Sequence, residues 1–310
     1  MELIKPSVEI IDQEHGLQGV YRQIERIARI CRKSEDKITE DSAENFVKTL
    51  IQKGETAMLE HGTVYLEFPD SQVYESRMER YQKNYYSRVN DSNIRLVTTN
   101  YRVIIENSWA DDLVYICENR HETTCHESRI SVKFICDRGA SHELVRHRAF
   151  SFAQESSRFS LDMKNNPLKF IIPVWLSHVL PEGTYSFDDI QSFSSSKVQA
   201  YLDLLLFADQ VYRKLRKEEI IHVEDAGMHK EGYVEIIKGW TLQEVRSVLP
   251  TSIKTELVMT GFLSDWIGGN RGGNNEKWGF LPLRNDKKAH PQVLELAIMV
   301  EKLFKERGLL

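Results

Sequence analysis

Residues 129–159 read RISVKFICDRGASHELVRHRAFSFAQESSRF and contain several structural patterns in direct succession. Their opening part alternates between apolar and mostly polar side chains, which predicts a strand over 129–136. Residues 137–139 (Asp-Arg-Gly) predict a turn after that strand, and we expect a helix to begin near Ser141. The cationic run at 146–148 (Arg-His-Arg) therefore follows closely on a strand and a turn.

The rest of the chain mixes helical and strand patterns. Apolar residues at helical spacing predict a helix over 39–53, with Thr39 as its N-cap and Gly54 just beyond its end. The remaining expected elements, in chain order, are a strand at 63–68, strand-like pieces near 94–105, 113–117 and 171–175, a helix over 196–219, a helix from Thr241, a glycine-rich loop at 267–279 and a helix over 291–305. This mixture predicts an α/β fold.

Composition narrows the class of protein. The chain has 310 residues, of which 41% are hydrophobic and 10% aromatic, so it can bury a sizeable core. Its net charge of −5 gives no basic footprint for nucleic acid, and its apolar runs are too short to span a membrane. No signal peptide is visible and none of the four cysteines forms a CxxC pair, so we expect a cytoplasmic protein without disulfides.

The run Arg146-His147-Arg148 allows two interpretations. Arginine's planar fork suits phosphate and carboxylate oxygens, so the run could hold anionic ligands. On a helix its neighbouring side chains point about 100° apart, so they would contact ligands on different sides. The alternative is a solvated helix face on which Glu143 and Arg146 pair at i, i+3.

The spacing of this run resembles that of a known family. Arg146-His147-Arg148, seven residues and then Ser156 match the motif of the flavin-dependent thymidylate synthases, and residues 137–159 resemble its bacterial and phage branch. Residues 24–61, 244–260 and 281–292 resemble further parts of that family. The resemblance implies an α+β fold with a central, mostly antiparallel sheet, in a single domain with insertions near 70–128, 175–240 and 267–279.

The resemblance also implies an activity. Family members are methyltransferases that convert dUMP to dTMP, with methylenetetrahydrofolate as carbon donor and FAD, reduced by NADPH, as hydride carrier. They are homotetramers with active sites where subunits meet. The implied FAD-binding residues are Arg146, His147 and Arg148, and the implied substrate-binding residues are Glu143, Gln154, Ser156, Arg158, Arg246 and Arg284.

Arg284 and Ser156 are the two residues expected at the reacting nucleotide. Arg284 matches the arginine that contacts the uracil carbonyl, where it would stabilise enolate-like charge as C5 becomes nucleophilic. We interpret Ser156 as a nucleotide ligand rather than a nucleophile. No cysteine follows a proline, so the cysteine route of the folate-only enzymes is not indicated.

Several flavin or folate positions depart from the family pattern. The register gives Glu55, Thr56 and Ala57 where the family has His-x-Ser or His-x-Thr. A later Asn-x-Arg that binds FAD is replaced by Phe262 and Ser264. We hypothesise that Asn270 and Arg271, in the nearby insertion, supply replacement FAD contacts. The alternative is a solvent-exposed, disordered insertion.

Other functions stay open. A related enzyme that acts on dCMP or leaves a hydroxymethyl group would also explain the altered flavin positions, and a nucleotide-binding homologue without catalysis is a further alternative. Residues 121–126 (HETTCH) lack HExxH spacing, and we expect no metal site. Nucleic-acid binding is disfavoured by the acidic charge balance.

Overall fold

The computed structural model describes residues 1–68, 71–90, 95–158, 167–217, 241–271 and 276–310. Its central sheet contains β2 (Ser7–Ile11), β6 (Arg129–Asp137), β10 (Lys254–Phe262) and β7 (Ser151–Gln154), in the order β2-β6-β10-β7. All three strand pairs are antiparallel. The strand predicted over 129–136 is confirmed, and so is an α+β fold with a mostly antiparallel central sheet.

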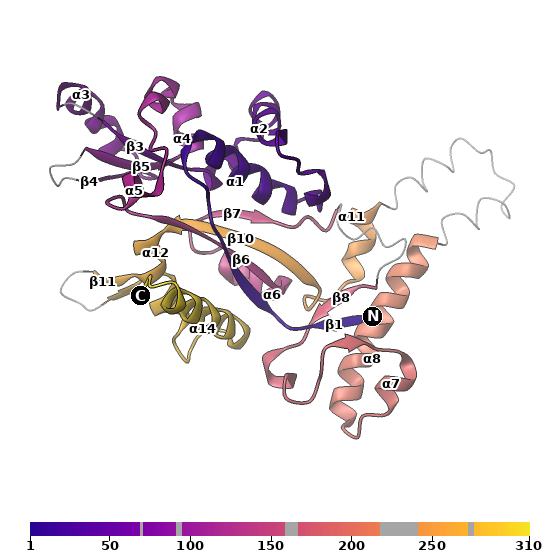
Figure 1. Cartoon of the computed structure of the whole chain (residues 1–310). Helices are drawn as coiled ribbons and strands as arrows, with labels where there is room; N and C mark the ends of the chain where they lie inside the picture. Colours follow the sequence, from indigo (N-terminus) through magenta and orange to yellow (C-terminus); the bar gives the residue numbers. More distant parts are fainter. Residues whose placement is uncertain (69–70, 91–94, 159–166, 218–240, 272–275) are drawn as a thin grey trace, which may run out of the picture.

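The two faces of this sheet pack against different helices (Figure 1). On one face, Phe134, Leu257 and Met259 are fully buried against α6 (Arg138–Leu144) and α14 (Pro291–Glu306). On the other face, Val258 and Ala153 pack against α1 (Gly16–Ile30). Each fully buried large apolar side chain contributes about 1.5–3 kcal/mol, so these alternating residues fix the register of the sheet.

A pair of helices precedes the sheet's long strands in the chain. α1 is followed by α2 (Ser42–Gln52), which confirms the helix predicted over 39–53 and the helix pair implied by the resemblance of 24–61. The N-cap is Asp41 rather than Thr39, whose backbone N–H instead donates to Ser42 Oγ. Gly54 has a φ of +69°, the left-handed conformation expected just beyond a helix end.

Residues 63–123 form a smaller sheet with its own helices. The strand predicted at 63–68 is confirmed as β3, and the piece near 94–105 divides into a strand and a helix. The strand expected near 113–117 is wrong, because Asp112 is buried and bound by Arg77 and Arg80, and its backbone N–H closes a turn on Trp109 O. The elements are β3 (Thr63–Glu67), α3 (Ser71–Gln82), β4 (Arg88–Asn90), β5 (Leu96–Asn100), α4 (Tyr101–Glu106), η3 (Ala110–Tyr115) and α5 (Arg120–Thr123), with the strand order β3-β5-β4.

A third group of elements surrounds the N-terminal strand. The long helix predicted over 196–219 is confirmed as α8 (Ser196–Lys217). The strand expected at 171–175 ends at Ile171, because Pro173 lacks the N–H that a ladder needs and a 3-10 turn follows. The elements are β1 (Glu2–Ile4), β8 (Lys169–Ile171), η4 (Val174–Leu176), β9 (Gly183–Thr184), α7 (Phe187–Gln191), α8, α11 (Leu242–Val245) and η5 (Arg246–Val248), with the strand order β8-β1-β9.

The glycine-rich segment at 267–279 is a hairpin rather than the expected loop. After α12 (Leu263–Ile267), β11 (Gly269–Arg271) pairs with β12 (Glu276–Trp278), and α13 (Phe280–Arg284) follows. Gly268 and Gly279 flank the hairpin with φ values of +64° and +92°, and a Cβ on Gly268 would collide with the carbonyl of Trp278. The glycines therefore mark the tight entry and exit of the hairpin. No helix in the described part of the chain is long and apolar enough to cross a membrane.

Candidate active site

The cationic run lies in a turn that joins α6 to β7, not in a helix. α6 begins at Arg138, earlier than the predicted start near Ser141, because the Asp137 side chain accepts a hydrogen bond from Ala140 N at 2.8 Å and caps the helix. The helix ends at Leu144, so Arg146-His147-Arg148 follows it directly. Asp137 thus sets where the cationic turn begins.

Arg284, the last residue of α13, is held over this turn by three hydrogen bonds. Its Nε donates to His147 Nε2 at 2.7 Å, and its Nη2 and Nη1 donate to the backbone and side-chain oxygens of Glu143 at 2.9 and 3.4 Å. The Arg284 side chain is only 17% exposed. Since long side chains rarely hold one rotamer without such contacts, Arg284 is preorganised.

His147 can hold Arg284 only as a neutral imidazole. Its Nε2 accepts from the guanidinium, so the ring proton is assigned to Nδ1. Burial and, to a smaller extent, the charge of Arg284 lower the pKa of His147 to about 4, against the opposing effect of Glu143. Phe150 and Phe280 pack against the ring. His147 is therefore neutral at physiological pH and acts as an acceptor.

The two other cationic side chains of the turn are exposed. Arg146 is 71% exposed, and its Nη1 donates to Glu143 Oε1 at 3.0 Å. This is the i, i+3 pair expected under the solvated-face interpretation, although the backbone there is a turn. Arg148 is also exposed. The structure thus brings Arg146, His147 and Arg284 together around Glu143, with Arg148 beside them in the chain.

A cavity of about 290 Å³ lies on the other side of α6. Arg138 and Arg246 both line it, and Arg246 Nη1 donates to the hydroxyl of buried Ser157 at 2.9 Å. Burial lowers the pKa of Arg138, and the nearby charge of Arg246 lowers it further. No carboxylate in the described part of the chain forms an ion pair with either arginine, so this cavity suits a multiply charged anion.

The end of the motif is fixed by side-chain and backbone hydrogen bonds beside that cavity. Gln154 Nε2 donates to Ser141 Oγ at 2.9 Å, and Ser156 N donates to Cys31 O at 2.8 Å. Arg158 N donates to Ser156 Oγ at 3.3 Å, and the Arg158 side chain is exposed. These bonds anchor β7 and its exit to α6 and to the end of α1.

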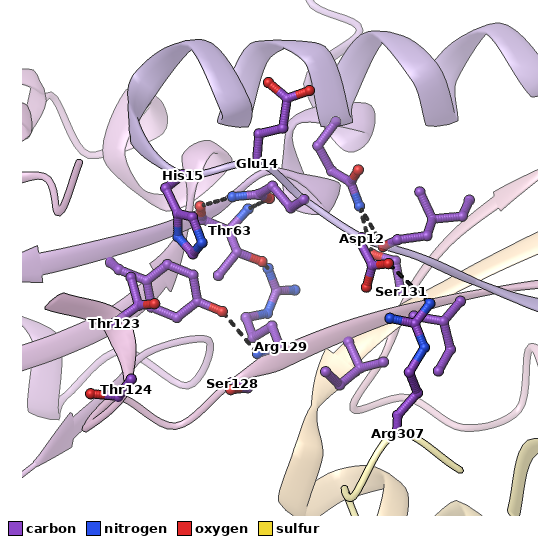
Figure 2. A pocket seen from close by; sticks show the side chains of 16 residues that line it. Asp12, Glu14, His15, Thr63, Thr123, Thr124, Ser128, Arg129, Ser131 and Arg307 are labelled. Carbon is purple, nitrogen blue, oxygen red and sulfur yellow. Dashed lines mark hydrogen bonds and ion pairs between the residues drawn. The ribbon is translucent and has the colours of Figure 1, made fainter. Parts of the chain in front are cut away.

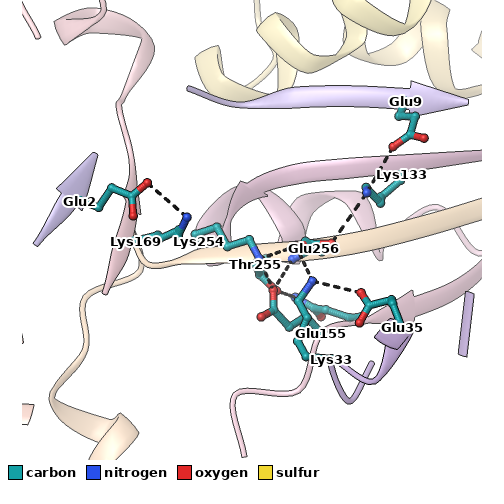
Figure 3. Close-up of polar contacts among 11 residues, drawn as sticks. Glu2, Glu9, Lys33, Glu35, Lys133, Glu155, Lys169, Lys254, Thr255 and Glu256 are labelled. Carbon is teal, nitrogen blue, oxygen red and sulfur yellow. Dashed lines mark hydrogen bonds and ion pairs between the residues drawn. The ribbon is translucent and has the colours of Figure 1, made fainter. Parts of the chain in front are cut away.

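A network of buried charged side chains supports the segment that follows β7 (Figure 3). Lys254 Nζ donates to Glu155 Oε2 at 2.9 Å and to Glu256 Oε1 at 2.5 Å, and Lys33 also pairs with Glu256. Burial alone would raise the pKa of Glu256, but the ammonium groups of Lys254 and Lys33 lower it to about 2. Glu155 directly precedes Ser156, so the network sets where the motif serine lies.

Comparison with known proteins identifies the family of the chain. Residues 71–307 match the family described as "Thymidylate synthase complementing protein". The chain belongs to this family. The match confirms the family resemblance inferred from the motif.

Curated relatives bear the name flavin-dependent thymidylate synthase. The relative from Corynebacterium diphtheriae is 27% identical over 173 residues, which cover 55% of this chain and 54% of the relative. The relative from Mycobacterium sp. (strain JLS) is 26% identical over 191 residues, 61% of this chain and 63% of the relative. The relative from Pyrococcus furiosus is 25% identical over 165 residues, 53% of each chain. The matched part of the chain spans about half the length of most of these relatives.

The altered family positions contact other parts of this chain. Phe262 is 4% exposed, with the guanidinium of Arg88 4.4 Å from its ring centre, and Ser264 Oγ donates to Glu127. Glu55 pairs with Arg32 at 3.2 Å. Phe262 and Ser264 are therefore engaged with residues of segment 70–128 rather than presented to a ligand.

The residues proposed to replace them are only partly described. Asn270 and Arg271 lie in β11, close after α12, which places their backbone near the altered positions Phe262 and Ser264 in the chain. Their side chains, and residues 272–275 of the hairpin tip, lie outside the described residues. The role of Asn270 and Arg271 in FAD binding stays a hypothesis.

Sequence reasoning missed Arg138 and His142, which line the Arg246 cavity. A usable pattern was present, because an arginine directly after a strand and at the start of a helix lies where a helix N-terminus favours anions. In the HETTCH segment, His126 alone is buried: its Nδ1 shares a hydrogen bond of 3.3 Å with Thr98, and its Nε2 lies 3.5 Å from Cys117 Sγ. Among the described residues, no group of three or more metal-binding side chains occurs.

Proposed function

We propose that this chain is a flavin-dependent thymidylate synthase that converts dUMP to dTMP, with methylenetetrahydrofolate as carbon donor and FAD reduced by NADPH. The observation that carries the proposal is the cavity at the end of the motif. There, Arg138 and Arg246 face one space of about 290 Å³ without a carboxylate partner among the described residues. Such a cavity fits the phosphate of a nucleotide.

The phosphate dianion would take the two guanidinium groups of that cavity. Each charge-assisted contact contributes about 1.5–3 kcal/mol, and the dianion would also relieve the repulsion between Arg138 and Arg246. Ser157 already accepts one Arg246 N–H, so the guanidinium has a defined orientation before the nucleotide arrives. Ser156 and Arg158, which follow β7, would complete the nucleotide site.

Arg284 would act on the uracil ring. Its guanidinium is held by Glu143 of α6 and by His147 in the turn after that helix, while His142 of α6 lines the phosphate cavity. A nucleotide along α6 would therefore place its phosphate at Arg246 and its base toward Arg284. There, a guanidinium N–H can donate to a uracil carbonyl and stabilise the negative charge that develops when C5 attacks the one-carbon unit.

The cysteines do not offer an alternative nucleophile near this site. Burial raises the pKa of Cys31 to about 11 and the pKa of Cys117 to about 12, and burial also raises the pKa of Cys136. These three thiols are protonated at neutral pH and are poor nucleophiles. A route that avoids a cysteine adduct on the pyrimidine fits this chain better.

The exposed turn fits the anionic part of FAD. Arg146 and Arg148 present cationic groups beside His147, and a flavin dinucleotide carries a diphosphate that suits them. When bound, FAD supplies the hydride that reduces the one-carbon unit to a methyl group. Val145 and Leu283, which flank this site, are 39% and 45% exposed, and we propose that a second subunit of a homotetramer covers them.

A second candidate activity follows from the altered flavin positions. Because Phe262 and Ser264 contact the insertion, fewer side chains are available to FAD than the family pattern provides. A weakened hydride step would leave a hydroxymethyl product on dUMP or dCMP. The two candidate activities would share the same site and the same steps up to the transfer of the one-carbon unit.

Product mass separates these activities. The purified chain is incubated with methylenetetrahydrofolate, NADPH, FAD and either dUMP or dCMP, and the nucleotide product is identified by mass spectrometry. Formation of dTMP, lost in Arg284→Ala and kept in the exposed-surface control Arg22→Ala, is the expected result. A hydroxymethyl product would establish the second candidate instead. Nucleotide binding without any product would overturn both and indicate a non-catalytic homologue.

A further inference from the structure

A second and larger cavity, of about 490 Å³, lies at the opposite end of β6 (Figure 2). It shares no lining residue with the Arg246 cavity. β6 has nine residues at about 3.3 Å each, so Arg129 at its start lies about 30 Å from Arg138 just beyond its end. The two cavities are therefore separate sites on one strand.

Arg129 is the central charged residue of this cavity. Its Nη1 donates to Glu60 O at 3.0 Å and to Thr63 Oγ1 at 3.5 Å, both uncharged acceptors. Its Nε is buried without a hydrogen-bond partner, and its Nη2 donates to none of the described residues. No described carboxylate forms an ion pair with it. Figure 2 shows the guanidinium pointing in among the residues that line the cavity.

The carboxylates of the lining are already neutralised. Asp12 pairs with Arg307 at 3.2 Å, and Glu14 pairs with Arg22 at 2.6 Å. His15, the N-cap of α1, also lines the cavity, so the positive end of a 15-residue helix lies at its edge. The surplus charge of the cavity is therefore positive and is concentrated on Arg129.

We propose that this cavity binds a small organic anion, with a carboxylate or phosphoryl group on the Arg129 guanidinium. Burial lowers the pKa of Arg129 to about 10 against the opposing effect of Tyr65, Glu60 and Asp265, and none of the described carboxylates forms an ion pair with it. A buried guanidinium without an ion-pair partner is costly. An anion that accepts from Nε and Nη2 satisfies both free donors in a bidentate contact. The volume lies in the range of small-molecule sites, about 300–1,000 Å³.

The walls of this site come from both sheets. Thr63 and Tyr65 come from β3, and Thr123 and Thr124 come from the end of α5, while β2 and β6 supply the opposite wall. The Tyr65 hydroxyl accepts from Arg129 N at 3.4 Å, which ties the smaller sheet to the central one. The meeting of the two sheets thus creates an anion site that is distinct from the proposed nucleotide site.

Calorimetric titration tests the proposal with two probes, inorganic phosphate and citrate. The titrations use the full chain carrying Arg246→Gln, so that the nucleotide cavity does not contribute. We expect one anion per chain, and at least tenfold weaker binding when Arg129→Gln is added. Binding of citrate alone would assign a carboxylate ligand, and binding of phosphate alone would assign a phosphoryl ligand.

Two further variants keep the test independent of folding. Thr124→Glu places a negative charge on the exposed wall without touching the contacts of Arg129, and it should also abolish binding. Thr39→Glu, at an exposed position on neither cavity, is the matched charge control and should bind as the parent does. The proposal is overturned if neither probe binds to the Arg246→Gln chain, or if Arg129→Gln and Thr124→Glu both bind as tightly as Thr39→Glu.

Discussion

The two ends of β6 handle buried positive charge in different ways. At the end of the strand, Arg138 and Arg246 face one cavity together, and their charges oppose each other. At its start, Arg129 stands alone among neutral acceptors. Two repelling guanidinium groups suit a dianion such as a nucleotide phosphate, whereas a single guanidinium suits one carboxylate or phosphoryl oxygen pair. The two proposed ligands differ in charge for this reason.

The interactions that position the residues at the two ends of β6 also differ. The Arg246 end rests on buried ion pairs around Lys254, whereas Arg129 is positioned by carbonyl and hydroxyl oxygens. Removing one partner of a buried ion pair leaves an uncompensated charge, which costs more than the loss of a neutral hydrogen bond. Variants at the Arg246 end should therefore give the larger effects.

Lys254→Met should have the largest effect. It leaves Glu155 and Glu256, which are 8% and 12% exposed, buried beside each other without the shared ammonium group. We expect a loss of about 3–5 kcal/mol in the free energy of unfolding, measured by urea denaturation at pH 7. The matched control Lys48→Met, in an exposed pair with Glu44, should change stability by less than about 0.5 kcal/mol. Equal effects of the two variants would contradict the role of burial.

Arg246→Gln and Arg138→Gln should weaken dUMP binding next most strongly. Each removes a contact of about 1.5–3 kcal/mol, which corresponds to roughly 10- to 150-fold in Kd. Fluorescence or calorimetric titration with dUMP measures the change. Arg129→Gln should leave dUMP affinity unchanged, since Arg129 lies about 30 Å from Arg138 along β6. A large loss in Arg129→Gln would show that the two ends are not independent.

The contrast between the two ends also explains what the sequence revealed. Gln154 ends β7 and Ser156 and Arg158 follow it closely, so the family motif covers all three residues in one short run of the chain. Arg246 and Arg284 became readable only through the family resemblance, because tertiary packing of η5 and α13 brings them to α6. The predicted arginine set divides along α6, with Arg246 at the cavity and Arg284 at His147.

The Arg129 cavity had no comparable pattern in the sequence. Its walls come from β2, β3, the end of α5, β6 and the C-terminal Arg307, which are separated by long stretches of chain. No periodicity or spacing relates these segments, so only the folded arrangement places them together. The same reason applies to the hairpin at 269–278, where strand pairing overrides a glycine-rich composition typical of loops.

His147 should show a smaller, pH-dependent effect. The pKa of His147 is about 4 in the folded chain, against an ordinary value of 6.5 in the unfolded chain. Between pH 4 and pH 6.5 the unfolded chain therefore binds more protons than the folded chain. The contribution of the neutral ring to the free energy of unfolding is therefore complete above about pH 6.5 and declines as the pH falls toward 4, where the folded ring takes up a proton and the Arg284–His147 hydrogen bond is lost. An NMR titration of the His147 ring should give a midpoint near pH 4, and His147→Leu should lower kcat/KM on the order of tenfold at neutral pH. A midpoint near 6.5 would show that the ring is solvated and does not position Arg284.

The double variant Asn270→Ala/Arg271→Ala should have the smallest effect. Phe262 and Ser264 are occupied by contacts with Arg88 and Glu127, so a bound FAD would need other partners at the end of β10 that pairs with Arg129. β11 follows that end through α12, and the tight turns at its glycines limit how far it can move. Single hydrogen bonds contribute about 0.5–1 kcal/mol, which predicts roughly two- to fivefold weaker FAD binding, measured by flavin fluorescence. If the affinity for FAD is unchanged, the hairpin does not belong to the flavin site, and Arg146 and Arg148 are the main cationic contacts. In that case the binding of both flavin and nucleotide would depend on the segment that follows α6.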